Sequence, residues 1–145
     1  MGTVVRRTIV LLVVVWATAM AAAGGAAAQD GLTVTATSAQ VGPHRTSVVL
    51  RGSYSCGPFS SGVPDRGVID LSIEQVRGGH TVTAYGFLEP SLCDGSPQAF
   101  EVLLTGTGGK RFRAGAATWA GSGYVEGDTG LQHIQVAPTP ITLTR

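Results

Sequence analysis

Residues 93–118 read CDGSPQAFEVLLTGTGGKRFRAGAAT, and this stretch holds the features that decide the fold. Within it, the segment 98–105 alternates apolar and polar side chains, as in a strand with one buried face. The inward positions are Phe100, Val102 and Leu104. Glycines at 106–109 indicate a turn into a further strand. Cys93, just before the alternating segment, is one of only two cysteines in the chain.

The same period-two alternation recurs on both sides of this stretch, separated by segments rich in Gly, Pro, Ser and Asp. The expected strands are 32–37, 46–56, 68–76, 80–87, 98–105, 113–125 and 131–136. This pattern predicts an all-β fold, an immunoglobulin-like β-sandwich of about seven strands. Residues 137–145 contain two prolines, so we expect an edge extension or a tail there.

The first 28 residues have the composition of an export signal. Arg6 and Arg7 precede a strongly apolar run, and small residues end at Ala28. We therefore predict a cleaved signal peptide over 1–28 and a single domain over 29–145. A retained membrane anchor is the alternative, because the apolar stretch is long enough to span a bilayer. The expected location is secreted or extracellular, with cell-wall association left open.

The predicted mature domain holds eight of the ten Lys and Arg and all nine Asp and Glu, so its formal charge is −1. It has no basic run of the kind that marks nucleic-acid or anionic membrane binding. We therefore expect no nucleic-acid partner and, after signal cleavage, no membrane association.

The two cysteines, Cys56 and Cys93, are expected to form a disulfide, because an exported chain meets an oxidising environment. Cys56 ends the segment 46–56 on the same face as its apolar residues. In an immunoglobulin-like topology the second and fifth strands are antiparallel neighbours. We therefore predict a bridge at one end of a single sheet.

A search of the sequence for catalytic or metal-binding patterns gives no candidate. The three histidines, His44, His80 and His133, have no acidic or histidine partner two or four residues away. Nucleophile-elbow, zinc-helix and phosphate-loop motifs are missing, and the acidic turn 126–130 lacks the ligand spacing of a calcium loop. We predict a protein that is not an enzyme and that uses no metal or cofactor.

Contact residues are harder to assign than catalytic ones. The two long loops 57–67 and 88–97 are joined by the predicted disulfide and are the preferred place for a contact surface. The candidate residues are Phe59, Arg66, Glu89 and Asp94. A second possibility is an exposed aromatic patch, with core positions as the alternative. Its members would be Phe59, Tyr85, Phe87 and Tyr124. The basic cluster in 110–113 is interpreted as a solvated turn.

Three short motifs carry a family resemblance that covers most of the predicted mature chain. They are G-x-Y-x-C at 52–56, C-D-G-S-P at 93–97 and F-R-x-G-x-A at 112–117. With the export signal, this order resembles a family of small secreted actinobacterial proteins whose domain has no assigned function. Ala114 stands where members often have Pro. The resemblance implies an immunoglobulin-like domain and brings no catalytic residues.

These observations favour a secreted, non-enzymatic interaction module whose partner is a protein, a glycan or a small molecule. The alternative is a carrier of an apolar small molecule in a sandwich cleft. It rests on an architectural resemblance to secreted actinobacterial chromoprotein carriers. Those proteins have two disulfides, whereas this chain can form one.

Overall fold

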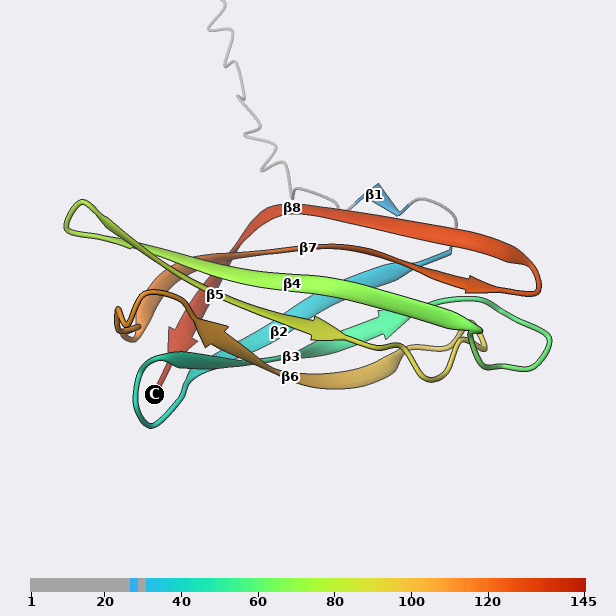
Figure 1. The fold of residues 1–145 in the computed structure, drawn as a ribbon, viewed down its shortest axis with the longest axis horizontal. Coiled ribbons are helices and arrows are strands. Elements are labelled where there is room, and N and C mark those ends of the chain that lie inside the picture. Colours follow the sequence, from blue (N-terminus) through green and yellow to red (C-terminus); the bar gives the residue numbers. More distant parts are fainter. Residues whose placement is uncertain (1–26, 29–30) are drawn as a thin grey trace, which may run out of the picture.

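The computed structural model describes residues 27–28 and 31–145, which form strands and, within this part of the chain, no helix (Figure 1). The strands are β1 (Ala27–Ala28), β2 (Thr33–Val41), β3 (Ser47–Ser55), β4 (Arg66–Arg77), β5 (His80–Leu88), β6 (Gln98–Gly106), β7 (Gly115–Gly127) and β8 (Gly130–Thr144). The predicted signal peptide lies outside the described residues except for β1, which pairs with β8. The predicted all-β class and seven main strands are confirmed.

The strands close into a barrel, and the predicted immunoglobulin-like sandwich is wrong. The order runs β8-β2-β3-β6-β5-β4-β7, and β7 pairs with β8 again. Closure depends on β8, which is antiparallel to β7 and parallel to β2. Alternation alone could not reveal this, because strands in sandwiches and barrels both alternate inward and outward side chains.

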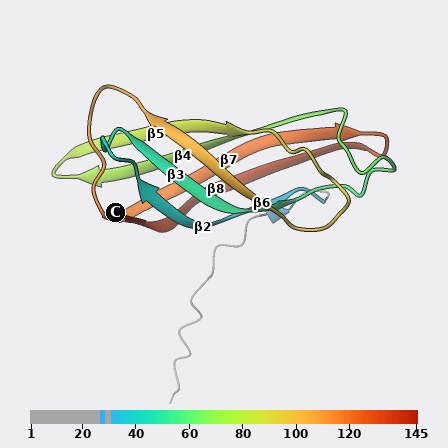
Figure 2. The same ribbon diagram turned by 90° about the horizontal axis from the view of Figure 1, so that it is seen from below.

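The barrel is flattened into two walls (Figures 1 and 2). One wall contains β5, β4, β7 and most of β8, and the other contains β2, β3 and β6. Pairing within each wall runs along most of the strands. The seam between β5 and β6 is much shorter, with Ala84 opposite Gly106 and Tyr85 opposite Thr105. The β2–β8 seam is equally short.

A bulge bends β8 from one wall toward the other. Trp119 is opposite Thr139 and Gly121 is opposite Val136, so two residues of β8 face only Ala120 of β7. One of the two is Pro138. A residue in a bulge is not paired, so the N–H that proline lacks removes no hydrogen bond from the sheet. The expected edge extension or tail at 137–145 is therefore wrong: residues up to Thr144 pair with β7 and β2 and complete the barrel.

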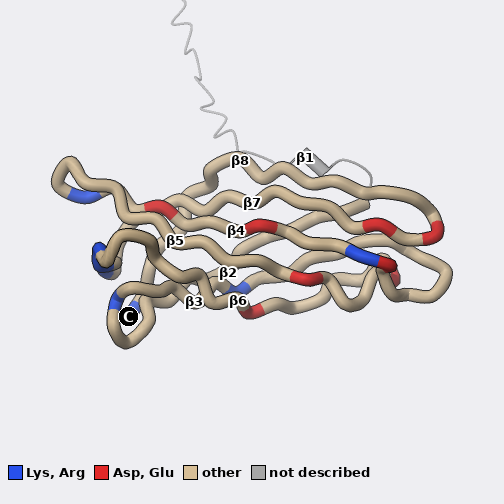
Figure 3. Tube along the Cα trace, in the orientation of Figure 1, with Lys and Arg blue, Asp and Glu red and all other residues tan. Residues whose placement is uncertain are grey.

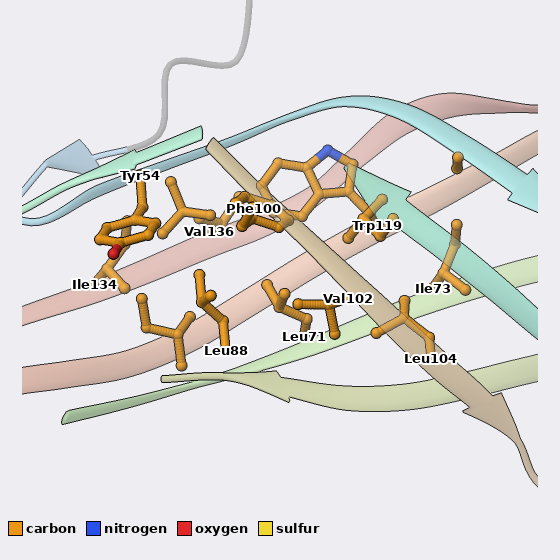
Figure 4. Close-up of a cluster of buried hydrophobic side chains, with 14 of the residues drawn as sticks. Tyr54, Leu71, Ile73, Leu88, Phe100, Val102, Leu104, Trp119, Ile134 and Val136 are labelled. Atoms are coloured by element: carbon orange, nitrogen blue, oxygen red, sulfur yellow. The ribbon is translucent and has the colours of Figure 1, made fainter. Parts of the chain in front are cut away.

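Apolar side chains from both walls fill the barrel interior (Figure 4). The predicted inward face of β6 is confirmed, and the alternate apolar positions of β3 and β4 are buried as well. Trp119, on β7, is the largest side chain of this interior and is 4% exposed. The Tyr54 ring is also buried, and its hydroxyl accepts a hydrogen bond from the Ser91 N–H at 3.2 Å.

Candidate functional site

The predicted disulfide is present: Cys56 bonds to Cys93, with their Cα atoms 4.6 Å apart. Cys56 directly follows β3 and Cys93 lies shortly before β6, and these strands are antiparallel neighbours. The bridge therefore lies at one end of a single wall, as predicted. The Phe59 N–H donates to the Cys93 carbonyl (2.9 Å), and the Cys93 N–H donates to the Gly62 carbonyl (2.7 Å). The two long loops thus form one packed unit.

Phe59 is a predicted contact residue, but its ring is buried and only 4% exposed. The ring lies against Gly127, the last residue of β7, where an added Cβ would come within 2.6 Å of it. Beside it, the Ser60 N–H donates to both carboxylate oxygens of Asp128, at 3.0 and 3.1 Å. Hydrogen bonding from Ser60 lowers the pKa of this carboxyl. The contact prediction is therefore wrong for Phe59, which anchors its loop to the turn.

The other three predicted contact residues are polar. Arg66 forms an ion pair with Glu126 on the neighbouring strand. Asp94 accepts hydrogen bonds from the N–H and hydroxyl of Ser96, and these lower the pKa of Asp94. Glu89 is exposed. Two of the three thus have local structural roles, and their use as a contact surface stays a prediction.

The three histidines lie on separate segments and are exposed: His44 after β2, His80 at the start of β5 and His133 on β8. The His133 ring lies beside Tyr124, with ring centroids 6.4 Å apart. Among residues 27–28 and 31–145, no group of three His, Cys, Asp or Glu side chains is placed to hold a metal ion. The described residues therefore offer no metal-binding group and no cluster of histidines on which a functional site could be built.

The clearest candidate surface is on the outside of β5. Val82 and Ala84 point into the core, so the next alternate positions, Tyr85 and Phe87, point outward and are 56% and 61% exposed. Leu103 of β6, across the short seam, is 60% exposed. Three large apolar side chains therefore face solvent together, and exposed apolar side chains that cluster are a feature of interaction sites.

Two shallow grooves flank Tyr85. The first follows the β5–β6 seam, with side chains of Asp70, Tyr85, Phe87, Glu101, Leu103 and Thr105 along it. The second crosses β4, β7 and β8, and its walls include Asp70, Ser72, Tyr85, Ala120, Ser122, Gln135 and Pro138. Tyr85 and Asp70 belong to both, so Tyr85 forms a ridge between two open channels.

Strand register explains the shape of this surface. One cross-strand row is Tyr85, Ser72 and Ala120. The adjacent row is Phe87, Asp70, Ser122 and Gln135. Small side chains in the middle of each row leave a trough between the β5 aromatics and β8. We call the outward side chains of these two rows, together with Leu103 and the half-buried Tyr124 of β7, the aromatic face.

Sequence reasoning identified part of the aromatic face. Of the two possibilities for the aromatic residues, exposed patch or core, Tyr85 and Phe87 follow the first, Phe59 is buried, and Tyr124, on the same wall, is half-buried. Leu103 was not among the predicted members. Its outward position in the clearest alternating segment, 98–105, is the sequence signal by which it could have been found. The sequence also carried no sign of the polar trough, because two hairpins that are far apart in the chain, β4–β5 and β7–β8, contribute to it.

A scan against models of known protein families matches none, and searches of curated proteins and of solved structures likewise find no significant match. The resemblance to a secreted actinobacterial family therefore stays a prediction. Within the described residues, no helix is long and apolar enough to cross a membrane.

Proposed function

We propose that this protein is a secreted, non-catalytic module that binds a neutral glycan chain across the aromatic face. The observation that carries the proposal is the pair of rings, Tyr85 and Phe87, each more than half exposed beside grooves that combine apolar and polar side chains. The disulfide supports an extracellular setting, because such bonds persist in oxidising compartments.

The aromatic pair suits a sugar chain in both chemistry and spacing. A pyranose ring has an apolar C–H face that stacks on an aromatic ring, and burying such surface is favourable. Tyr85 and Phe87 are alternate residues of one strand, so their side chains emerge about 7 Å apart. That spacing is comparable to the length of one hexose unit, which allows successive sugars to contact successive rings.

The trough beside the rings supplies hydrogen-bonding groups for the sugar hydroxyls. A carboxylate accepts, an amide both donates and accepts, and a hydroxyl does either. These groups come from Asp70, Gln135, Ser72 and Ser122. An apolar wall with a few polar groups is the composition expected of a ligand site, in which the polar groups set orientation.

The shape and the charge of the two grooves restrict the class of ligand further. Both grooves are open along the outside of the barrel, which suits a chain better than an enclosed small molecule. Asp70, which forms no ion pair within the described residues, lines both grooves, and neither groove is lined by Lys or Arg. An anionic chain would be repelled there. We therefore propose a neutral glycan.

The alternative function, a carrier of an apolar small molecule, requires space between the walls. Large side chains, including Trp119 and Phe100, occupy that interior (Figure 4). Both grooves of the aromatic face lie outside the barrel. This packing favours the surface-binding proposal over the carrier.

The proposal predicts that removing either ring weakens glycan binding. Tyr85→Ala and Phe87→Ala are each expected to lower the affinity about tenfold, since a stacked ring contributes on the order of 1.4 kcal/mol. Tyr85→Phe should keep most of the affinity, because it keeps the ring. Affinity electrophoresis through gels containing soluble β-glucan, mannan or glycol chitin measures the change.

Leu131→Ala is the matched control, because Leu131 is an exposed apolar residue of the β7–β8 turn region, outside the aromatic face. Its mobility should equal that of the wild-type protein in every gel. Unchanged retardation of the Tyr85→Ala/Phe87→Ala double variant would overturn the proposal, as would a wild-type protein that no neutral glycan retards.

A further inference from the structure

Positive charge in the described residues is gathered at one end of the barrel (Figure 3). Residues 31–145 contain eight Lys and Arg, of which Arg51 and Arg66 form ion pairs with Glu101 and Glu126. The other six cations are Arg45, Arg77, Lys110, Arg111, Arg113 and Arg145. We call this group the basic end. No ion pair in the described part of the chain involves any of the six.

Four separate segments bring these cations together: the turn 42–46, the β4–β5 hairpin, the loop 107–114 and the last residue. Two adjacent hollows lie among them. Arg45, Arg77 and Arg113 line both, Lys110 and Arg111 line the first, and Arg145 lines the second. His80 also lines the first hollow. The site is therefore a continuous basic surface rather than one isolated turn.

Gathering like charges lowers the stability of the folded protein, because charges closer together than the screening length of the salt solution repel one another. In the chain, the nearest acidic residue to this group is Glu74, three positions before Arg77 on β4. Ion pairing is used elsewhere in the barrel, so the chain does not lack carboxylates. Binding of an anion at the basic end would relieve the repulsion.

Buried contacts hold the backbone of the basic end in place. Phe112 is fully buried, and its N–H donates to the Arg45 carbonyl at 2.7 Å. Gln75, 1% exposed, donates to the carbonyls of Arg113 (2.9 Å) and Ala116 (3.3 Å) and accepts from the Arg113 N–H (3.1 Å). Arg45 has a φ of 61°, which is uncommon for a side chain other than glycine. The hollows are thus preorganised, which lowers the entropy cost of binding.

We propose that the basic end binds the phosphodiester groups of an anionic extracellular polymer. Arginine presents a planar fork of N–H donors that matches phosphate oxygens, and five of the six cations are arginines. Two adjacent hollows that share three arginines suit consecutive phosphates of a chain better than a single ion.

The composition of this end favours such a polymer over a single-stranded nucleic acid or a membrane. Nucleic-acid grooves combine cations with aromatic platforms for the bases, and membrane-surface sites combine them with inserted apolar side chains. The exposed aromatic rings, Tyr85 and Phe87, lie toward the other end of β5, so they give the basic end no platform for bases. Beside Arg77, the exposed large apolar side chain is Val76, which is small for insertion into a membrane.

This site is separate from the aromatic face. His80 and Phe87 stand at opposite ends of β5, about 23 Å apart along the strand at roughly 3.3 Å per residue. Neither proposal needs the other, and each has its own variants. Loss of phosphate binding would leave the glycan proposal standing, and the reverse also holds.

The test is a titration of the purified protein with a fluorescent poly(glycerol phosphate) oligomer between 50 and 300 mM NaCl. We expect a plot of log affinity against log salt with a slope of about −2, as for three phosphate contacts at about 0.7 each. Arg77→Gln/Arg111→Gln should bind about tenfold more weakly at the lowest salt and bring the slope to about −0.7, because two of the three contacts are lost. Far-ultraviolet circular dichroism checks that the variant is folded.

Thr129→Glu/Leu131→Glu is the charge-matched control, because it changes the net charge by the same amount in the turn at the opposite end of the barrel. It should bind like the wild-type protein. Equal weakening in this control, or a wild-type affinity that does not fall with salt, would overturn the proposal. So would equal or tighter binding of inorganic phosphate, of oligo(dT), or of vesicles containing phosphatidylglycerol, since each identifies a different source of the anion.

Discussion

Replacing both Cys56 and Cys93 with alanine is expected to lower the free energy of unfolding by about 4 kcal/mol. The bridge joins residues separated by 37 positions, and cutting it lets the unfolded chain sample many more conformations. Both cysteines are fully buried, so alanine also leaves small voids. Urea denaturation followed by tryptophan fluorescence, extrapolated to zero urea, measures the loss.

Wild-type protein unfolded and refolded in a reducing agent is the internal control, and it should approach the stability of the double variant. A loss below about 1 kcal/mol would mean that the hydrogen bonds between the two loops, with the buried Phe59, hold this end of the barrel without the bridge. That result would contradict the role assigned to the disulfide.

Leu143→Ala is expected to cost about 3 kcal/mol, as for other buried leucines. Leu143 is 1% exposed and lies opposite both Ala39 of β2 and Gly115 of β7, so it sits where the barrel closes. The same urea titration measures the change in unfolding free energy.

Thr142→Ala is the matched control, because Thr142 is the exposed neighbour on the same strand. Its effect should stay within about 0.5 kcal/mol. If Leu143→Ala were equally mild, the last residues would behave as a tail and the closed barrel would be wrong.

The strands themselves could be predicted because each carries its own signal. Alternation in 98–105 and 68–76 identifies β6 and β4, and glycine turns separate them from their neighbours. No local sequence pattern indicated that the strands close into a barrel. Two prolines indicated an edge extension or a tail after Val136, whereas a bulge at Pro138 accommodates the proline ring and redirects β8 toward β2. Which strand a segment pairs with depends on contacts between residues far apart in the chain.

The aromatic face was predictable only in part for the same reason. In β5, Val82 and Ala84 alternate with Tyr85 and Phe87, and either face could have been buried on hydrophobicity alone. The small core-facing side chains fit because Trp119 and other large residues fill the space between the walls. The aromatic rings are therefore left outside.

The basic end was visible in the sequence only as the cluster in 110–113, which by itself is typical of a solvated turn. Arg45, Arg77 and Arg145 are each more than 30 positions from that cluster. The barrel brings them to the same end because strand ends and turns alternate between its two ends. A charge pattern that depends on topology in this way cannot be read from local composition.

The most direct test of the aromatic face is a map of the backbone amides that respond to a glycan. Isotope-labelled protein would be titrated with a soluble neutral oligosaccharide of the class that retards it most, and followed by two-dimensional NMR. We expect the signals of Tyr85, Phe87 and Ser122 to shift, while those of the disulfide-linked loops 56–65 and 89–97 stay in place. Shifts confined to those two loops, with Tyr85 and Phe87 unchanged, would contradict the proposed binding surface.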